Sequence, residues 1–419
     1  MSVSGASVNL RPLPSGALPR GWLAYLGPAF LVSVGYMDPG NWATDIEGGA
    51  RFGYSLLWVL LAANVMALLL QYLSAKLGLA TGLTYPRVCR EMLNRRLNFV
   101  LWATAEIAAI ATDLAEFLGA ALGFYLLLHI PMLPAAVITA LAVFAILGLY
   151  RFGYRAVEFI IIAFVAVIGV SYVFEVWVVQ PDWAGVAGGV LVPRLSGDSI
   201  LIAMGMLGAT VMPHNLYLHS GVILTRREAD PLLNRGTPRA ALMDSAVALN
   251  LAWLVNSAIV IMAAAAFFTR GLDIDSIEEA HQTLVPLFGE GAAVAFALAL
   301  LAAGLSSSTT ATLAGQIIIE GFLNIRFGLF LRRAITVVPA IIIIAMGLDA
   351  YWVLILSQVL LSVQLPFAVI PLIWLTSRRD VMGDFVNRRW ITLLAWIFAA
   401  AIVALNVALL VRLVGGAGT

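Results

Sequence analysis

Eleven stretches of roughly 20 mostly apolar residues follow one another along this chain, each long enough to cross a bilayer as a helix. Inside the hydrocarbon, only helices and closed barrels bond all of their own backbone groups. Charged residues make up 11% of the chain, against about 25% in soluble domains. The sequence therefore predicts an all-α polytopic membrane protein with eleven transmembrane helices. Their predicted ranges are 22–49, 54–76, 98–128, 132–149, 156–179, 199–224, 241–268, 286–319, 332–348, 351–375 and 390–414.

The basic residues support this number of helices. An odd number places the termini on opposite sides, and cytoplasmic loops carry an excess of Lys and Arg. With the N-terminus in the cytoplasm, 20 of the 24 basic residues fall inside, and only Arg51, Arg194, Arg270 and Arg412 fall outside. We therefore expect a cytoplasmic N-terminus and a C-terminus outside. The net charge of +1 hides this asymmetry and gives no reason to expect a nucleic-acid partner.

The first residues and the cysteine content indicate the compartment. Residues 1–21 are expected to form a cytoplasmic lead, and the apolar run after them lacks the cleavage site of a signal peptide. Cys89 is the only cysteine and lies in a predicted cytoplasmic loop, which excludes disulfides and thiolate metal clusters. Short loops and no organelle-targeting segment favour the bacterial cytoplasmic (inner) membrane.

Two of the predicted helices are interrupted at matching places. Asp38-Pro39-Gly40-Asn41 interrupts the first helix, and Met212-Pro213-His214-Asn215 interrupts the sixth. Since each broken helix begins a set of five helices, an odd number, the second set crosses the membrane in the opposite sense to the first. This is the pattern of an inverted repeat, which places a transport site at the breaks. The repeats are predicted at 22–180 and 199–376, with 388–414 as an additional helix.

The residues at the breaks suggest a site for a metal ion. Proline has no N–H, so carbonyls about one turn earlier, those of Gly35 and Ala209, lose their helical partners and need another. Asp38 adds a carboxylate, Asn41 an amide oxygen and Met212 a thioether sulfur. Mg²⁺ and Ca²⁺ prefer shells of oxygen alone, so the sulfur favours transition metals. Met212 could instead be a packing residue, as most methionines are.

Four motifs give the chain a family resemblance. They are YMDPGNWAT at 36–44, GATVMPHNLYLHS at 208–220, TDLAEF at 112–117 and LSQV at 356–359. With them the chain resembles the Nramp family of divalent metal transporters. The resemblance implies a LeuT-type 5+5 inverted repeat with broken helices 1 and 6. It also implies proton-coupled uptake of Mn²⁺ and Fe²⁺, and of Co²⁺ or Cd²⁺.

The same resemblance suggests which residues bind the metal. The family's ligands match Asp38, Asn41, Met212 and the carbonyl of Ala209, with Gln358 as a further contact. Apart from Gln358, these are the residues to which the chemistry of the breaks already points. Mn²⁺ or Fe²⁺ and protons are expected as cargo, with no prosthetic group, and the protein is expected to be a monomer.

A second set of titratable groups lies in the third predicted helix. Glu106, Asp113 and Glu116 fall within an arc of about 80° and along roughly 15 Å of the helix axis. The family resemblance implies that protons leave the metal site along such a path, from Asp38 toward the cytoplasm. The alternative is that these acids pair structurally with Arg332 and Arg333.

Two histidines follow the second break. His214 lies beside the proposed ligand Met212 and titrates near neutral pH in its ordinary state, so it is the better candidate for relaying protons. His219 is expected to line the cytoplasmic half of the protein or to pack.

Other functions fit the same architecture less well. An organic-solute transporter, such as one for amino acids, would bind a substrate carboxylate at half-helix N-termini, which an Asp and a Met at the breaks disfavour. A passive metal channel is the other alternative, distinguished by the dependence of its flux on voltage and pH gradient. An enzyme is not expected, because the chain lacks the His/Glu pattern of a hydrolytic zinc site.

Overall fold

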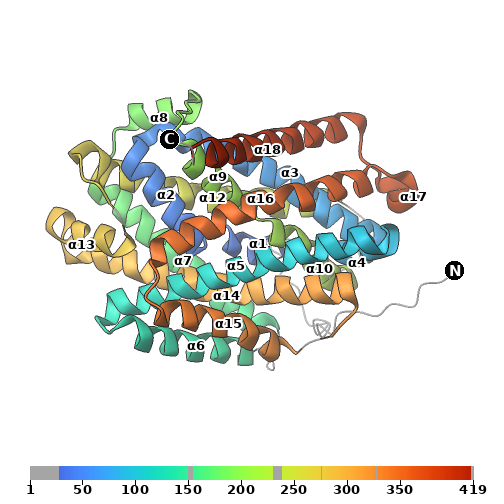
Figure 1. The fold of residues 1–419 in the computed structure, drawn as a ribbon, viewed down its shortest axis with the longest axis horizontal. Coiled ribbons are helices and arrows are strands. Elements are labelled where there is room, and N and C mark those ends of the chain that lie inside the picture. Colours follow the sequence, from blue (N-terminus) through green and yellow to red (C-terminus); the bar gives the residue numbers. More distant parts are fainter. Residues whose placement is uncertain (1–27, 150–153, 230–237, 275, 327, 417–419) are drawn as a thin grey trace.

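The computed structural model describes residues 28–149, 154–229, 238–274, 276–326 and 328–416, and these residues form helices and connecting turns with no strand (Figure 1). The predicted lead, residues 1–21, lies outside the described residues. Most of the long helices run roughly parallel or antiparallel in one bundle. This is the all-α arrangement that the apolar stretches predict.

Each predicted span overlaps a helix in the described residues. The first and sixth spans each contain two helices, α1 (Pro28–Gly35) with α2 (Pro39–Phe52), and α9 (Ile200–Val211) with α10 (Pro213–Ala229). The other spans correspond to α3 (Leu57–Thr81), α5 (Arg95–Leu128), α6 (Met132–Gly148), α7 (Tyr154–Val179), α12 (Pro238–Ala266), α14 (Glu290–Leu323), α15 (Leu329–Ala345), α16 (Ala350–Thr376) and α18 (Arg389–Gly416). Eight segments of the described chain are long and apolar enough to cross a membrane. The total of eleven transmembrane helices therefore stays a prediction.

Some helix ends differ from the prediction because of local backbone signals. The helix expected at 286–319 begins at Glu290, since Gly289 adopts a positive φ of 88° that separates it from the preceding helix. It continues to Leu323 and ends where Asn324 adopts the left-handed conformation, with φ of 59°. Such ends are set by single residues, whereas the apolar pattern locates only the middle of a span.

In the described part of the chain, four short α-helices lie between the long ones. They are α4 (Tyr85–Met92), α8 (Trp183–Leu191), α13 (Ile277–Phe288) and α17 (Arg379–Met382). The Cys89 segment, expected to be a loop, therefore contains a helix. Ser276 begins α13 by accepting a hydrogen bond from the N–H of Glu279 at 3.0 Å. Cys89 is fully buried in α4, and burial raises the pKa of its thiol, which keeps it unreactive.

The two longest helices, α5 and α14, pack against each other through glycines. A Cβ added at Gly304 would lie 2.5 Å from the backbone nitrogen of Ala120, and one at Gly123 would lie 2.7 Å from the Cα of Leu301. Helices in lipid associate through such close packing of small residues. The α5 and α14 pair supports α1, α2 and α16, which carry the site described below.

We expect Gly304→Leu to destabilise the protein by about 1–3 kcal/mol, because the new side chain would overlap the backbone of α5. Gly148→Leu, on α6, is the matched control, since no atom lies within 4 Å of a Cβ added there. The measurement is the unfolding temperature of the purified protein in detergent. Equal unfolding temperatures for the two variants would contradict the proposed close packing.

Candidate metal centre

The first break forms where α1 stops and α2 begins. The N–H groups of Tyr36 and Met37 bond to the carbonyls of Ser33 and Val34, at 3.0 and 3.1 Å, which tightens the last turn of α1. In a continuous helix the Gly35 carbonyl would accept from the N–H of residue 39, which is a proline and has none. The chain therefore leaves the helix at the place that the sequence predicts.

Asp38 occupies the N-cap of α2. Its Oδ1 atom accepts a hydrogen bond from the backbone N–H of Asn41 at 2.9 Å. The Asn41 side chain points back, and its Nδ2 donates to the carbonyl of Tyr36 at 2.6 Å. Both residues are fully buried. One turn of chain thus fixes the position of a carboxylate and of an amide.

The second break is centred on Met212, between α9 and α10. Met212 has φ of 42° and ψ of 93°, a backbone conformation that side-chain-bearing residues rarely adopt and that costs about 1–3 kcal/mol. Its N–H bonds to the carbonyl of Gly208 at 3.2 Å, and its carbonyl accepts from the N–H of Asn215 at 3.1 Å. Pro213 offers no N–H to the carbonyl of Ala209. Both breaks therefore remove a helical partner from the carbonyl four residues before a proline.

Several oxygen atoms near the breaks lack hydrogen-bond partners in the described part of the chain. Among them are three from the predicted ligands, namely Oδ2 of Asp38, Oδ1 of Asn41 and Oε1 of Gln358. The three side chains are all fully buried. Buried polar atoms without partners are uncommon in folded proteins, and each calls for an explanation. Three unpaired acceptors fit a cation, because a cation takes lone pairs and needs no donor.

Helix α16 contacts the elements of both breaks through Gln358. A Cβ added at Gly40 of α2 would overlap the side chain of Gln358, and one added at Gly208 of α9 would overlap its carbonyl. The Gln358 amide also lies within interaction range of the Asp38 carboxyl group. Because Gly40 and Gly208 have no side chains, Gln358, which was expected as a ligand from the family resemblance, can lie against the first break.

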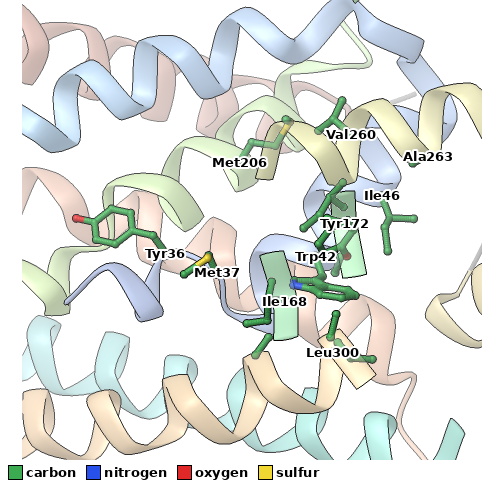
Figure 2. Packing of buried hydrophobic residues seen from close by; sticks show 14 of the residues in the cluster. Tyr36, Met37, Trp42, Ile46, Ile168, Tyr172, Met206, Val260, Ala263 and Leu300 are labelled. Carbon is green, nitrogen blue, oxygen red and sulfur yellow. The ribbon is translucent and has the colours of Figure 1, made fainter. Parts of the chain in front are cut away.

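Helices α1 and α10 meet directly at Asn215. A Cβ added at Gly35 would lie 2.5 Å from the Nδ2 atom of Asn215. The same amide nitrogen donates to the sulfur of Met212 at 3.3 Å. The thioether is thus held close to the end of α1, and the predicted ligands from both halves of the chain lie in one region. Figure 2 shows Tyr36 and Met37, which lead into the first break, among the buried apolar side chains of this region.

A polar network is centred on Tyr36. Its carbonyl accepts from Nδ2 of Asn256 at 2.8 Å, in addition to its bond with Asn41. Its hydroxyl accepts from Nε2 of Gln71 at 2.6 Å and donates to the carbonyl of Val211 at 3.4 Å. Gln71 and Asn256 stand out in the sequence as polar residues within apolar spans, but the sequence does not show which groups they bond to.

The same network reaches the second histidine. Oε1 of Gln71 lies 2.9 Å from Nδ1 of His219, and both side chains are buried. His219 is therefore connected to the first break through Gln71 and Tyr36. This contact with α3 agrees with the expectation that His219 packs.

The predicted acids on α5 meet the two arginines of α15. Glu106 forms an ion pair with Arg332. Asp113 forms one with Arg333 at 3.1 Å, and the side chains of Asp113 and Arg333 are both fully buried. Arg333 also donates to the hydroxyl of Ser308 on α14. The structural pairing that the sequence left open as an alternative is therefore present.

Glu116 differs from the other two acids. It is fully buried, and neither carboxyl oxygen has a hydrogen-bond partner among the described residues. It lies within electrostatic range of both Asp38 and Asp113. Glu116 is thus the acid on α5 that connects the metal centre with the ion pairs.

His214 links the second break to α5. Its Nδ1 atom lies 3.3 Å from the hydroxyl of Thr112, the residue before Asp113. Its Nε2 atom has no partner among the described residues. The imidazole therefore lies between the backbone of the Met212 break and the acidic face of α5.

Several further buried acids were missed by sequence reasoning, among them Asp45, Glu47 and Glu175. Asp45 and Glu175 are almost fully buried and have carboxyl oxygens without partners among the described residues. Glu47 binds Arg51 at 2.8 Å and the hydroxyl of Tyr351 at 2.7 Å, which joins α2 to α16. Asp45 lies seven residues after Asp38, on the same face of α2, and this spacing could have indicated it.

Comparison with known proteins places this arrangement in a family. The model of the natural resistance-associated macrophage protein-like (Nramp) family matches residues 29–412. The chain is 48% identical to the divalent metal cation transporter MntH of Deinococcus radiodurans, over 99% of this chain and 95% of that protein. It is 46% identical to the protein of the same name from Caldanaerobacter subterraneus, over 96% of each.

Solved structures agree with the family model. The manganese transporter of Eremococcus coleocola is 35% identical, with a TM-score of 0.83 over 96% of this chain and 90% of that one. The nucleobase-cation-symport-1 family transporter Mhp1 is 15% identical, with a TM-score of 0.62 over 91% of this chain and 89% of its own. The likeness to Mhp1 shows the fold alone, which is the LeuT-type fold expected from the sequence. The chain belongs to the Nramp family.

Proposed function

We propose that this protein takes up divalent transition metal ions across the cytoplasmic membrane of a bacterium. The observation that carries the proposal is the set of three unpaired buried oxygens, on Asp38, Asn41 and Gln358, beside two interrupted helices. Relatives of the chain are named as divalent metal cation and manganese transporters. The chemistry of the donors and the names of the relatives therefore point to the same class of cargo.

The proposed ligands are the side chains of Asp38, Asn41, Met212 and Gln358 and the carbonyls of Ala209 and Gly35. Oxygen ligands alone would suit Mg²⁺ and Ca²⁺ as well as Mn²⁺. The thioether of Met212 favours Mn²⁺, Fe²⁺, Co²⁺ or Cd²⁺ over the two abundant ions. Its amide neighbour Asn215 holds the sulfur by a single weak hydrogen bond, which a metal ion could replace.

We expect Met212→Ala to retain part of the Mn²⁺ uptake and to let Ca²⁺ or Mg²⁺ compete roughly tenfold better, a difference of about 1.4 kcal/mol. The measurement is Mn²⁺ uptake by proteoliposomes in the presence of each competitor. Met206→Ala is the matched control, since Met206 is equally buried on α9 and lies outside the proposed ligands. Unchanged competition in Met212→Ala would rule out the thioether as the source of selectivity.

Asp38→Asn is expected to reduce metal uptake to the level of empty liposomes, because the only carboxylate among the proposed ligands is lost. Asp182→Asn, at the exposed N-cap of α8, serves as the control for loss of an acid. Calorimetry measures Mn²⁺ binding directly, so it distinguishes a loss of binding from a loss of the conformational change that transports the ion. Retained high-affinity binding in Asp38→Asn would refute the assignment of Asp38 as a ligand.

The proposed mechanism is alternating access coupled to protons. The metal binds from outside at the two breaks, and α1 and its neighbours then rearrange to release it inward. The proton is proposed to pass from Asp38 to Glu116 and on to Asp113 and Glu106. Arg332 and Arg333 form ion pairs with Glu106 and Asp113, and His214 lies between the second break and this face of α5.

Glu116→Gln is expected to reduce metal-driven proton entry roughly tenfold or more while leaving part of the Mn²⁺ uptake, because the amide cannot take up a proton. Proteoliposomes with an internal pH dye report the proton, and Mn²⁺ uptake is followed in parallel. Glu279→Gln, on the exposed side of α13, is the control. Proton entry at the unmodified rate would remove Glu116 from the path.

The orientation in the membrane is part of the same proposal. The distribution of basic residues supports a cytoplasmic N-terminus and an external C-terminus. The protein is proposed to act as a monomer, without a prosthetic group. Mn²⁺ uptake that requires an inward proton gradient would distinguish this transporter from a passive metal channel.

A further inference from the structure

A groove of about 880 Å³ lies between α7 and α12. Its floor includes Met37, the residue before Asp38, and Tyr172. Its walls include Val173 on α7 and Leu254 on α12, and its lining contains no charged side chain. Figure 2 shows that Met37, Ile168 and Tyr172 come together near the first helix break. The groove therefore runs from the side of the bundle to the backbone beside the metal centre.

The walls of the groove belong to two segments that are long and apolar enough to cross a membrane, Ile160–Val179 and Leu242–Arg270. Side chains on these walls point away from the protein, with exposures of 73% for Val173 and 55% for Leu254. In a spanning helix, such apolar side chains face hydrocarbon. The medium that reaches the groove is therefore lipid, and a charged or strongly polar occupant would lose its solvation there.

One end of the groove has the composition of a membrane interface. Trp177, Gln180, Pro181 and Trp183 line it there. Both tryptophans are largely exposed, and tryptophan is enriched where hydrocarbon meets headgroups. From Val165 to Gln180 the lining spans 15 residues, or about 22 Å if helical throughout, which is somewhat more than one bilayer leaflet.

We propose that this groove binds one acyl chain of a phospholipid from the outer leaflet. The headgroup lies at the end marked by Trp177 and Trp183, and the tail reaches Met37 and Tyr172. The occupant is amphipathic because the groove has a polar aromatic end and an apolar floor. This site is separate from the proposed metal ligands, and only its assignment to the outer leaflet rests on the membrane orientation proposed above.

Gly169 provides a way to close the groove. It lies on α7 and lines the groove, and no atom lies within 4 Å of a Cβ added there. The Cβ of a leucine at this position would therefore lie in open space at the groove lining, and the rest of its side chain is expected to fill part of the groove. Gly148, on α6 and outside the groove lining, is equally open and gives a matched control.

The test uses the full chain in lipid nanodiscs with a phosphatidylglycerol that carries a photoreactive diazirine in the middle of one acyl chain. After irradiation, the labelled residues are located by mass spectrometry of peptides. We expect label on Met37 or Tyr172, which are each only 1% exposed and are reached through the groove. This label should fall at least fivefold in Gly169→Leu and stay unchanged in Gly148→Leu.

Other outcomes would overturn the proposal. Label confined to outward residues such as Val173 and Trp177 would show only the lipid that surrounds any membrane protein. Label at Met37 and Tyr172 that persists in Gly169→Leu would also refute it. If a second copy of the chain fills the groove, Met37 stays unlabelled and Gly169→Leu converts a dimer to a monomer in light scattering. Gly169→Ala, which adds one methyl group, gives a graded loss if the leucine variant does not fold.

Discussion

The rule that backbone polar groups in a bilayer need partners governs this structure. Pro39 and Pro213 each remove the N–H that would have bonded to the carbonyl four residues earlier, at Gly35 and Ala209. In water such carbonyls would be hydrated, but at the middle of a bundle they depend on what the protein gathers around them. The packing of α16, α10 and α12 around the breaks follows from that need. Asn256 and Asn41 share the carbonyl of Tyr36, and Asn215 lies against the end of α1.

The buried charges follow a related logic. Asp113 and Arg333 are both fully buried, and removing either would leave its partner uncompensated, which costs about 3–5 kcal/mol in buried pairs. Glu116 has no such partner, although it lies on the same helix face. The acids on this helix face therefore fall into two groups, those held by ion pairs with α15 and Glu116, which has no arginine bound to it in the described part of the chain.

Local chemistry explains why much of the fold and of the site could be predicted. Apolar length and proline are properties of the chain itself, so the spans, the two breaks and the carbonyls of Gly35 and Ala209 follow from the sequence. The short helices α4 and α13 were missed because eight to twelve residues with charged faces look like loops by hydropathy. Helix ends such as Gly289 depend on one backbone angle.

Contacts between distant residues could not be predicted in the same way. Asp113 and Arg333 are 220 residues apart, and their pairing depends on how α15 lies against α5. Gln71 and Asn256 were recognisable as polar residues in apolar helices. Their common partner could not be predicted: Gln71 donates to the hydroxyl of Tyr36, and Asn256 donates to the backbone carbonyl of the same residue. Gln358 was expected only from the family resemblance, since nothing in its local sequence relates it to the first break.

The contact between Gln358 and Gly40 has a consequence for how strongly a metal ion can be held. Because Gly40 has no side chain, the amide of Gln358 occupies the space where a Cβ would be. A shift of α16 relative to α2 would withdraw the side chain of Gln358, a proposed ligand, while Asp38 and Asn41 stay fixed to each other by their shared turn. The number of ligands would then depend on the conformation of the protein. Affinity could fall stepwise as the bundle opens, so that release does not require the loss of the whole coordination shell at once.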